Sequence, residues 1–264
     1  MAPLVCTIGD LLLDVIVRVG APIAPDTDTY VETSVAAGGQ AANVAAWVAA
    51  LGGRGRVLAK RGADAAGRVA ADELAARGVE VVGPVVDRGT GTVVALVSPD
   101  GRRSMLSDRG VAPELAPGEL DPAWLDGCDW LHVPGYSLVR TPIAEATAAA
   151  AARAPRVSLD VSSTAAVQEL GPAEFAARAA ALRPEVVFAT EEEAELVPLD
   201  APTVVVKRGA AGCRVNGVEH PAHEAEVVDT TGAGDAFAAG FLLGGHEAAL
   251  AAAARCVATA GAMP

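Results

Sequence analysis

One glycine-rich stretch places a carboxylate at a point where an anion from solution is expected to bind. In DTTGAGDAFAAGF, residues 229–241, Asp235 follows Gly-Ala-Gly and precedes an apolar run typical of a helix. At a helix start, the amides of Gly232, Ala233 and Gly234 can converge on an anion. A carboxylate beside a bound phosphate is repelled unless it faces another group. We therefore interpret Asp235 as the proton acceptor for an attacking hydroxyl, with the amides stabilising a transferred phosphoryl group.

The same stretch has a simpler interpretation, an Asp that caps a helix after a glycine turn, and alone it does not decide between the two. A second motif, GGQAANVAAWVAALGG at residues 38–53, favours the interpretation of Asp235 as a proton acceptor. Gly38 and Gly39 allow a ligand to approach the backbone closely. Asn43, one turn into the helix, offers a donor and an acceptor to a sugar hydroxyl. Because a helix start favours a negative charge, we expect Asp235 to be ionised at neutral pH.

Alternating strand and helix signals indicate the elements that position these residues. The alternation predicts a mainly parallel sheet covered by helices on both faces, within one domain over residues 1–264. Two β-rich insertions, at about 13–36 and 79–106, are predicted to pair into a small lid sheet over the site, the second around a Pro-Asp-Gly turn at 99–101. Strands of the main sheet are expected at 4–8, 57–60, 130–133, 157–160, 186–189 and 203–207, and helices at 65–77, 142–154, 172–182, 191–197 and from Ala233 and Glu247.

Charge and cysteine usage exclude several classes of partner. With 33 acidic and 20 basic residues the formal net charge is −13, which argues against nucleic acid and acidic membranes as partners. The 4 cysteines are scattered without a C-x-x-C pair, which is typical of reduced thiols in a cytoplasmic protein. The N-terminus lacks the features of a signal peptide, and no uninterrupted apolar run reaches the roughly 20 residues of a membrane helix.

With both motifs in this order, the sequence resembles the PfkB (ribokinase-like) carbohydrate and nucleoside kinases over essentially the whole chain. The C-terminal family pattern is met without a gap from Asp229 to Leu242. The resemblance implies a three-layer α/β/α core with a β lid, and an ATP- and magnesium-dependent transferase acting on a hydroxyl of a sugar-like molecule. The N-terminal family pattern is met by Gly38, Gly39, Ala41, Asn43, Ala45, Gly52 and Gly62.

The resemblance also implies roles for individual residues. Asp235 matches the catalytic base, and Gly232, Ala233 and Gly234 match the anion hole. Thr190 stands where Asn is usual in the magnesium motif, and the acidic run beside it also suits an ordinary helix start. The other matches are Asp14, Gly38, Gly39 and Asn43 for substrate, Lys207, Gly209, Gly212 and Gly234 for ATP, Glu193 for magnesium through water, and Asp229 and Thr231 for a monovalent cation, with potassium as the candidate.

Several alternatives stay open. A nucleoside kinase of the same family is the nearest, although the insertions contain one aromatic residue, Tyr30, for stacking on a base. A non-catalytic sugar- or nucleotide-binding regulator is a second, and a dinucleotide-binding enzyme a weaker third. The lid sheet has an open edge, so a homodimer through the lid is expected. We interpret His220 and His223 as a surface turn, and Arg102–Arg103 as a solvated hairpin tip or a grip for an acidic or phosphorylated substrate.

Overall fold

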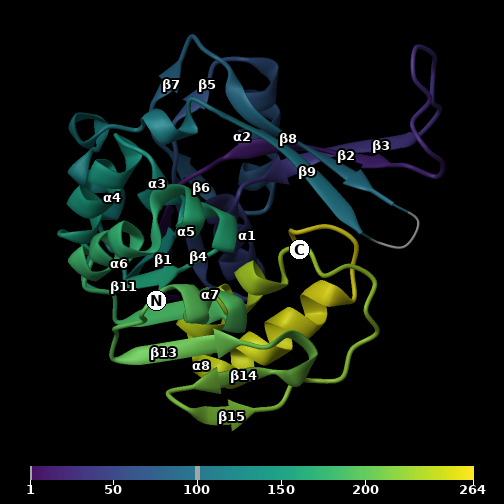
Figure 1. Cartoon of the computed structure of the whole chain (residues 1–264). Helices are drawn as coiled ribbons and strands as arrows, with labels where there is room; N and C mark the ends of the chain where they lie inside the picture. Colours follow the sequence, from purple (N-terminus) through teal and green to yellow (C-terminus); the bar gives the residue numbers. More distant parts are fainter. Residues whose placement is uncertain (1, 99–101) are drawn as a thin grey trace.

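The computed structural model describes residues 2–98 and 102–264. Within them, the main sheet has nine strands in the order β15-β14-β13-β12-β11-β10-β1-β4-β6, parallel from β13 to β6 (Figure 1). The predicted three-layer α/β class is confirmed. The strands are β1 (Leu4–Ile8), β4 (Arg54–Leu58), β6 (Glu80–Val82), β10 (Trp130–Pro134), β11 (Val157–Asp160), β12 (Val186–Thr190), β13 (Thr203–Lys207), β14 (Cys213–Val215) and β15 (Val218–His220).

Helices cover both faces of this sheet, because the strands are apolar on both sides. On β1, Leu4, Cys6 and Ile8 pack into one apolar cluster and Val5 into another. Such near-continuous apolar strands are typical of a buried parallel sheet. One face carries α1 (Gln40–Ala50), α2 (Ala65–Ala76) and α8 (Ala233–Val257), and the other carries α3 (Tyr136–Val139), α4 (Ile143–Ala151), α5 (Thr164–Leu170), α6 (Pro172–Ala181) and α7 (Glu191–Leu196).

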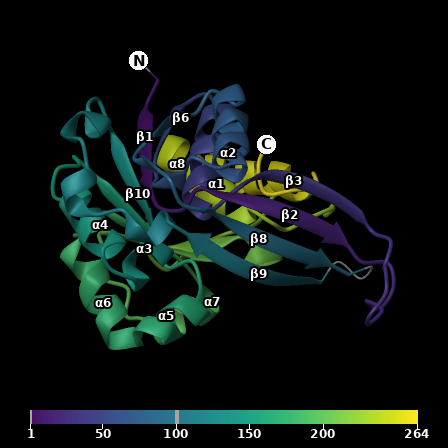
Figure 2. The same ribbon diagram turned by 90° about the horizontal axis from the view of Figure 1, so that it is seen from above.

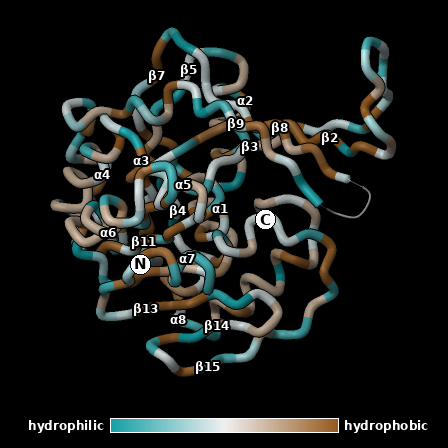
Figure 3. Tube along the Cα trace, in the orientation of Figure 1, coloured by the Kyte–Doolittle hydropathy of each residue, from teal (hydrophilic) through white to brown (hydrophobic). Residues whose placement is uncertain are grey.

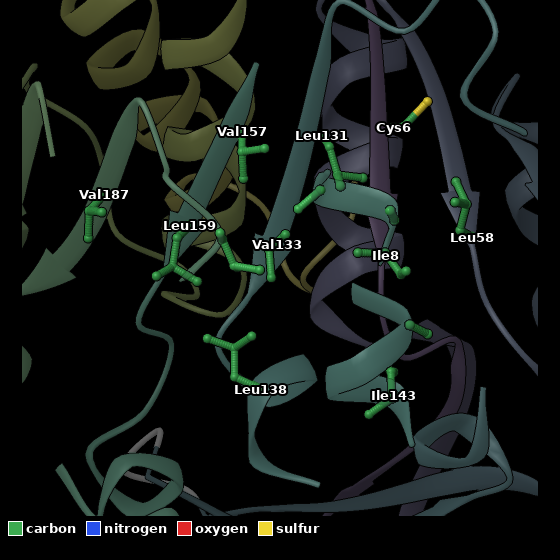
Figure 4. Packing of buried hydrophobic residues seen from close by; sticks show 14 of the residues in the cluster. Cys6, Ile8, Leu58, Leu131, Val133, Leu138, Ile143, Val157, Leu159 and Val187 are labelled. Carbon is green, nitrogen blue, oxygen red and sulfur yellow. The ribbon is translucent and has the colours of Figure 1, made fainter. Parts of the chain in front are cut away.

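The larger core cluster lies under α3 to α7. Figure 4 shows Ile8, Val133 and Leu159 on adjacent strands, with Leu138 and Ile143 reaching them from the helices. These side chains are at most 1% exposed. Figure 3 shows that hydrophobic residues concentrate along the strands of the main sheet and continue onto the lid strand β8. This largely aliphatic core fixes the strands whose ends carry the site.

The lid is a separate four-stranded sheet that projects from the core, as Figures 1 and 2 show. Its order is β3 (Glu32–Gly38), β2 (Leu12–Arg18), β8 (Thr90–Val97) and β9 (Arg103–Gly110). The expected boundary of the second insertion was wrong, because β6 pairs with β4 in the main sheet, β7 (Val85–Val86) pairs with β5 (Arg61–Gly62), and β9 continues to residue 110. The predicted turn at 99–101 lies outside the described residues.

Two sets of hydrogen bonds to carboxylates fix the base of the lid on the core. Arg109 of β9 donates two hydrogen bonds, of 2.7 and 2.9 Å, to the carboxylate of Asp10, just after β1. Asp64 caps α2 and also accepts hydrogen bonds from the amide and hydroxyl of Thr90 on β8. Charge-assisted bonds of this kind are about twice as strong as neutral ones. The lid strands therefore leave the core at a defined point.

The last helix differs from its prediction. The two expected helices form one element, α8, which kinks where Gly244 and Gly245 leave helical geometry. α8 is long and apolar enough to cross a membrane by length and composition, but half of its most apolar window is buried. Ala236, Phe237 and Ala239 pack against the main sheet, so we interpret α8 as a core helix.

Candidate active site

The start of α8 has the geometry of an anion site. Gly232 caps the helix with φ at 76°, a conformation that L side chains rarely adopt. A Cβ on Gly232 would also collide with the backbone of Ala262 in the C-terminal segment. The predicted amides of Gly232, Ala233 and Gly234 therefore lie at a helix start that requires glycine at its first position, as an anion-binding turn does.

Asp235 lies in the first turn of α8 and contacts the other glycine motif through Asn43. Its Oδ2 accepts a hydrogen bond of 2.8 Å from Nδ2 of Asn43 on α1. Burial and the charge of Asp160 raise the pKa of Asp235 to about 7, although Asn43 and Gln40 act in the opposite direction. Asp235 is therefore only partly ionised at pH 7, less than the helix start alone predicts, because desolvation opposes the charged form.

Two amide oxygens beside Asp235 have no partner in the described part of the chain. They are Oε1 of Gln40 and Oδ1 of Asn43, both in the first turns of α1. Buried acceptors are normally satisfied, so these two oxygens are available to a donor that enters the site. A sugar hydroxyl is such a donor.

A lysine and two carboxylates form the floor of the site. Nζ of Lys207 lies 2.6 Å from Oδ2 of Asp160, which is fully buried at the end of β11. Burial alone would lower the pKa of Lys207, but Asp160 and Glu193 raise it, so Lys207 stays charged. Lys207 also lies beside Gly234. The cation is thereby held where a phosphoryl group at the start of α8 would meet it.

Glu193, the predicted magnesium residue, forms a capping box with Thr190. The amide of Thr190 donates to Oε2 of Glu193 over 2.8 Å, and the amide of Glu193 donates to the Thr190 hydroxyl over 3.3 Å. Thr190 therefore supplies the helix cap that Asn also supplies, which accounts for the substitution in structural terms. Burial, followed by the charge of Asp160, raises the pKa of Glu193.

The predicted ATP residues line a cavity of about 480 Å³ beside α8. Lys207, Gly209, Gly212 and Gly234 border it on one side. The rest of its lining is largely apolar and would suit the flat ring of a nucleotide base. This apolar side consists of Val227, Phe237, Leu250, Ala253, Ala254 and Val257.

A second cavity, of about 330 Å³, lies between the lid and the loop that precedes α8. Asp14, the predicted substrate acid, lines it from β2. The carboxylate of Asp14 lies against Gly38, where any side chain would collide with it. Burial, together with the charge of Glu73, raises the pKa of Asp14 to about 6. Of the four predicted substrate residues, Asp14 lines this cavity and Gly38 lies against its carboxylate, whereas Gly38, Gly39 and Asn43 do not themselves line it.

The predicted monovalent-cation loop is held by an arginine of the lid. Asp229 accepts hydrogen bonds from the amides of Thr231 and Gly261, at 2.7 and 3.0 Å, and forms an ion pair with Arg103 of β9. Burial alone would raise the pKa of Asp229, but Arg103 and the two amides lower it to about 2. The hydroxyl of Thr231 has no partner among the described residues.

Sequence reasoning missed Asp160 and Gln40 and did not foresee the Arg103–Asp229 pair. Asp160 had a detectable signal, since it is the last residue of a predicted parallel strand, where ligands of α/β sheets bind. Within residues 2–98 and 102–264, neither His220 nor His223 belongs to a group of three or more His, Cys, Asp or Glu side chains that could hold a metal ion.

A parallel sheet with a β lid, and a helix start that carries Asp235 and whose turn lines two cavities through Gly234 and Thr231, are features of a phosphotransferase that acts on a hydroxyl of a small molecule. The family model for pfkB carbohydrate kinases matches residues 2–263, and the chain belongs to this family. The enzyme is an ATP-dependent kinase of sugar-like alcohols.

Individual relatives agree with this assignment. The chain is 32% identical to an ATP-dependent ribose-1-phosphate kinase of Halopiger xanaduensis, over 90% of this chain and 83% of the relative. It is 30% identical to a fructokinase-1 of Oryza sativa subsp. japonica, over 90% and 82%. Among solved structures, an adenosine kinase from Sinorhizobium meliloti superimposes with a TM-score of 0.87 at 25% identity, covering 100% of this chain and 96% of that one.

Proposed function

We propose that this kinase transfers the γ-phosphate of ATP to a hydroxyl of a small sugar, with Asp235 as the base. The observation that carries the proposal is the place of Asp235 in the turn that begins α8: Gly234, the residue before it, lines the first cavity, and Thr231, four residues before it, lines the second. ATP in one cavity and an alcohol in the other would meet at this carboxylate. The names of the relatives, a ribose-1-phosphate kinase and several fructokinases, support a sugar as the acceptor.

The reaction proceeds by in-line displacement. The proton of the substrate hydroxyl passes to Asp235 as the oxygen forms a bond to the γ-phosphorus and the bond from that phosphorus to ADP breaks. The amides of Gly232, Ala233 and Gly234, with the Lys207 ammonium, stabilise the charge on the transferred group. The lid and Asp14 orient the sugar, so positioning and electrostatics supply most of the acceleration.

The donor set of the site fits magnesium better than it fits a monovalent cation. Glu193 offers carboxylate oxygens, which magnesium prefers, whereas the Asp160 carboxylate is already paired with Lys207; magnesium when bound would neutralise phosphate oxygens. At the potassium loop, Arg103 already neutralises Asp229, and the Thr231 hydroxyl is a buried side-chain oxygen without a partner among the described residues. We expect activity to require magnesium and to survive replacement of potassium by tetramethylammonium. A strict potassium requirement would contradict this expectation.

An ADP-release assay over pentoses, hexoses, sugar phosphates, sugar acids and nucleosides tests the function. We expect turnover with at least one sugar-type acceptor. Turnover with nucleosides alone would favour the nucleoside-kinase alternative, to which the adenosine kinase similarity gives some weight. Binding of ATP and sugars without turnover would favour a regulator.

We also propose a cytoplasmic location, from the reduced cysteines, which recovery of the protein in a periplasmic or secreted fraction would contradict.

The pH dependence of kcat/KM should report the base. Asp235 must be deprotonated to accept a proton, and its pKa is about 7, so kcat/KM should rise with pH through 7 and fall about tenfold per unit below it. Below pH 6 the fall should steepen, since Asp14, with a pKa of about 6, also loses its charge there.

Asn43→Ala provides an internal control for this profile. The hydrogen bond from Asn43 lowers the pKa of Asp235, so its removal should move the acid limb to higher pH. A kcat/KM that is flat from pH 5 to pH 8, or a limb that Asn43→Ala leaves in place, would contradict the assignment.

We propose that the outer face of the lid pairs with a second copy. The strand register places Val15, Val35, Val94 and Leu106 on one row of the face turned away from the cavity. Val35 and Leu106 are each 58% exposed, and an apolar sheet face of this kind is a recognised interaction surface. Val35→Glu should convert a dimeric mass, measured by light scattering, to a monomeric one. Val85→Glu, at a residue 51% exposed outside the lid, should leave the dimer intact. A monomeric wild-type protein would contradict the proposal.

A further inference from the structure

The inner face of the lid carries two arginines at the end opposite Asp14. Asp14, Ile16 and Arg18 alternate along β2 with the residues of the outer face, so all three point to the same side of the sheet. The register places Val97 opposite Arg18, and Arg103 opposite Val97. Residues in register share a face, so Arg18 and Arg103 belong to one row across three strands. Both line the cavity that contains Asp14.

The two guanidinium groups differ in their partners. Arg103 is paired with Asp229, but a guanidinium has five N–H donors, and one carboxylate does not use them all. Arg18 is exposed and forms no hydrogen bond or ion pair within the described ranges. Glu32 lies opposite Arg18 on β3, yet the two are not bonded. A cation left without a partner at the mouth of a cavity is available to an anion.

The spacing along β2 sets the size of the ligand. Asp14 and Arg18 are four residues apart, a Cα separation of about 13 Å at about 3.3 Å per residue. The long Arg18 side chain shortens the distance that a ligand must bridge. Between the two ends, Ile16, Ala95 and Met105 form an apolar middle. One sugar unit fits this sequence of groups if its hydroxyls face Asp14 and an anionic substituent faces the arginines.

We infer that the acceptor is an anionic sugar, whose phosphate or carboxylate group is bound by Arg18 and Arg103 while Asp14 binds its hydroxyls. The inference rests on the proposed kinase function and narrows its substrate class. In a chain with a net charge of −13, an anionic acceptor is repelled by the surface as a whole, so its binding requires local cations such as these two.

Paired acceptors test the inference. We would compare kcat/KM for ribose with ribose 1-phosphate and ribose 5-phosphate, for fructose with its 1- and 6-phosphates, and for glucose with gluconate. At least one anionic member should exceed its neutral partner by about tenfold or more, the effect of a charge-assisted hydrogen bond. A preference for phosphates identifies a sugar phosphate and a preference for gluconate a sugar acid. Equal or better use of every neutral sugar overturns the inference and leaves the kinase function standing.

Arg18→Gln isolates the contribution of the site. It should raise KM for the anionic acceptor by about 10–100-fold with little change in kcat or in the KM of the neutral partner. Arg153→Gln is the matched control, since Arg153 is also exposed but follows α4, away from the lid (Figure 1). It should change neither constant. Equal losses for anionic and neutral acceptors would reduce Arg18 to a structural role and contradict the inference.

If no acceptor is phosphorylated, a thermal-shift series with the same sugar phosphates tests the anion site separately. In that case the kinase function fails, and stabilisation by a sugar phosphate that Arg18→Gln removes and Arg153→Gln retains would still support the anion site. Stabilisation that is the same in all three proteins, or none at all, would overturn it.

Discussion

Replacing Asp235 by Asn is expected to lower kcat by at least about 100-fold with the fold intact. The amide is nearly isosteric with the carboxylate and can keep a contact with Asn43, which now donates to Asp235 over 2.8 Å. It cannot accept the hydroxyl proton. The loss should therefore appear in kcat, because the proton moves only in the transition state. Single-turnover ADP formation, with circular dichroism and thermal unfolding to confirm the fold, measures it.

Two variants sharpen this test. Asp235→Glu keeps the carboxylate but moves it by one methylene, so it should retain more activity than Asp235→Asn and show its own acid limb. Asp72→Asn makes the same chemical change at an exposed position on α2 and should leave kcat unchanged. Near-normal turnover of Asp235→Asn would remove Asp235 from the role of base, and another acceptor would have to be sought.

The second large effect is expected in stability, from Lys207→Met. The Asp160 side chain has 0% solvent exposure, and its Oδ2 lies 2.6 Å from Nζ of Lys207. Water therefore cannot replace Lys207 as the partner of this carboxylate. Removing one partner of a buried ion pair leaves an uncompensated charge and costs about 3–5 kcal/mol. Urea unfolding should show this decrease in the free energy of unfolding. Turnover of the folded protein should also fall, because Lys207 lies beside Gly234 at the predicted phosphoryl site.

A double-mutant cycle separates the charge pair from simple packing. Asp160→Asn alone should also destabilise, and the double variant should be more stable than the sum of the two losses predicts. Lys60→Met is the comparison, because its partner Glu119 is 31% exposed, so water compensates in part. The decrease in the free energy of unfolding should be smaller for Lys60→Met than for Lys207→Met. Additive losses at Lys207 and Asp160 would show that their contact contributes no coupling to stability.

Local signals predicted much of the fold because they rest on side-chain periodicity and on glycines. The strands at 157–160 and 203–207 were predicted with the bounds observed, and the start of α8 at Ala233 followed from its glycine turn. The lid boundary failed at β6, since a short β-branched strand has the same local character in either sheet. Only its pairing with β4 assigns it to the core.

The sequence alone determined which residues are available for the chemistry: a carboxylate after Gly-Ala-Gly, a glycine pair before Asn43, and Asp14 near the N-terminus. These are local patterns, and each residue's type sets what bonds it can form. Only the tertiary structure decided which groups meet, such as Asp160 with Lys207 and Arg103 with Asp229, separated by 47 and 126 residues of chain. It also decided that Asp235 has a pKa of about 7. Proton affinity depends on burial and on charges brought from distant strands, and no local pattern in the chain records either.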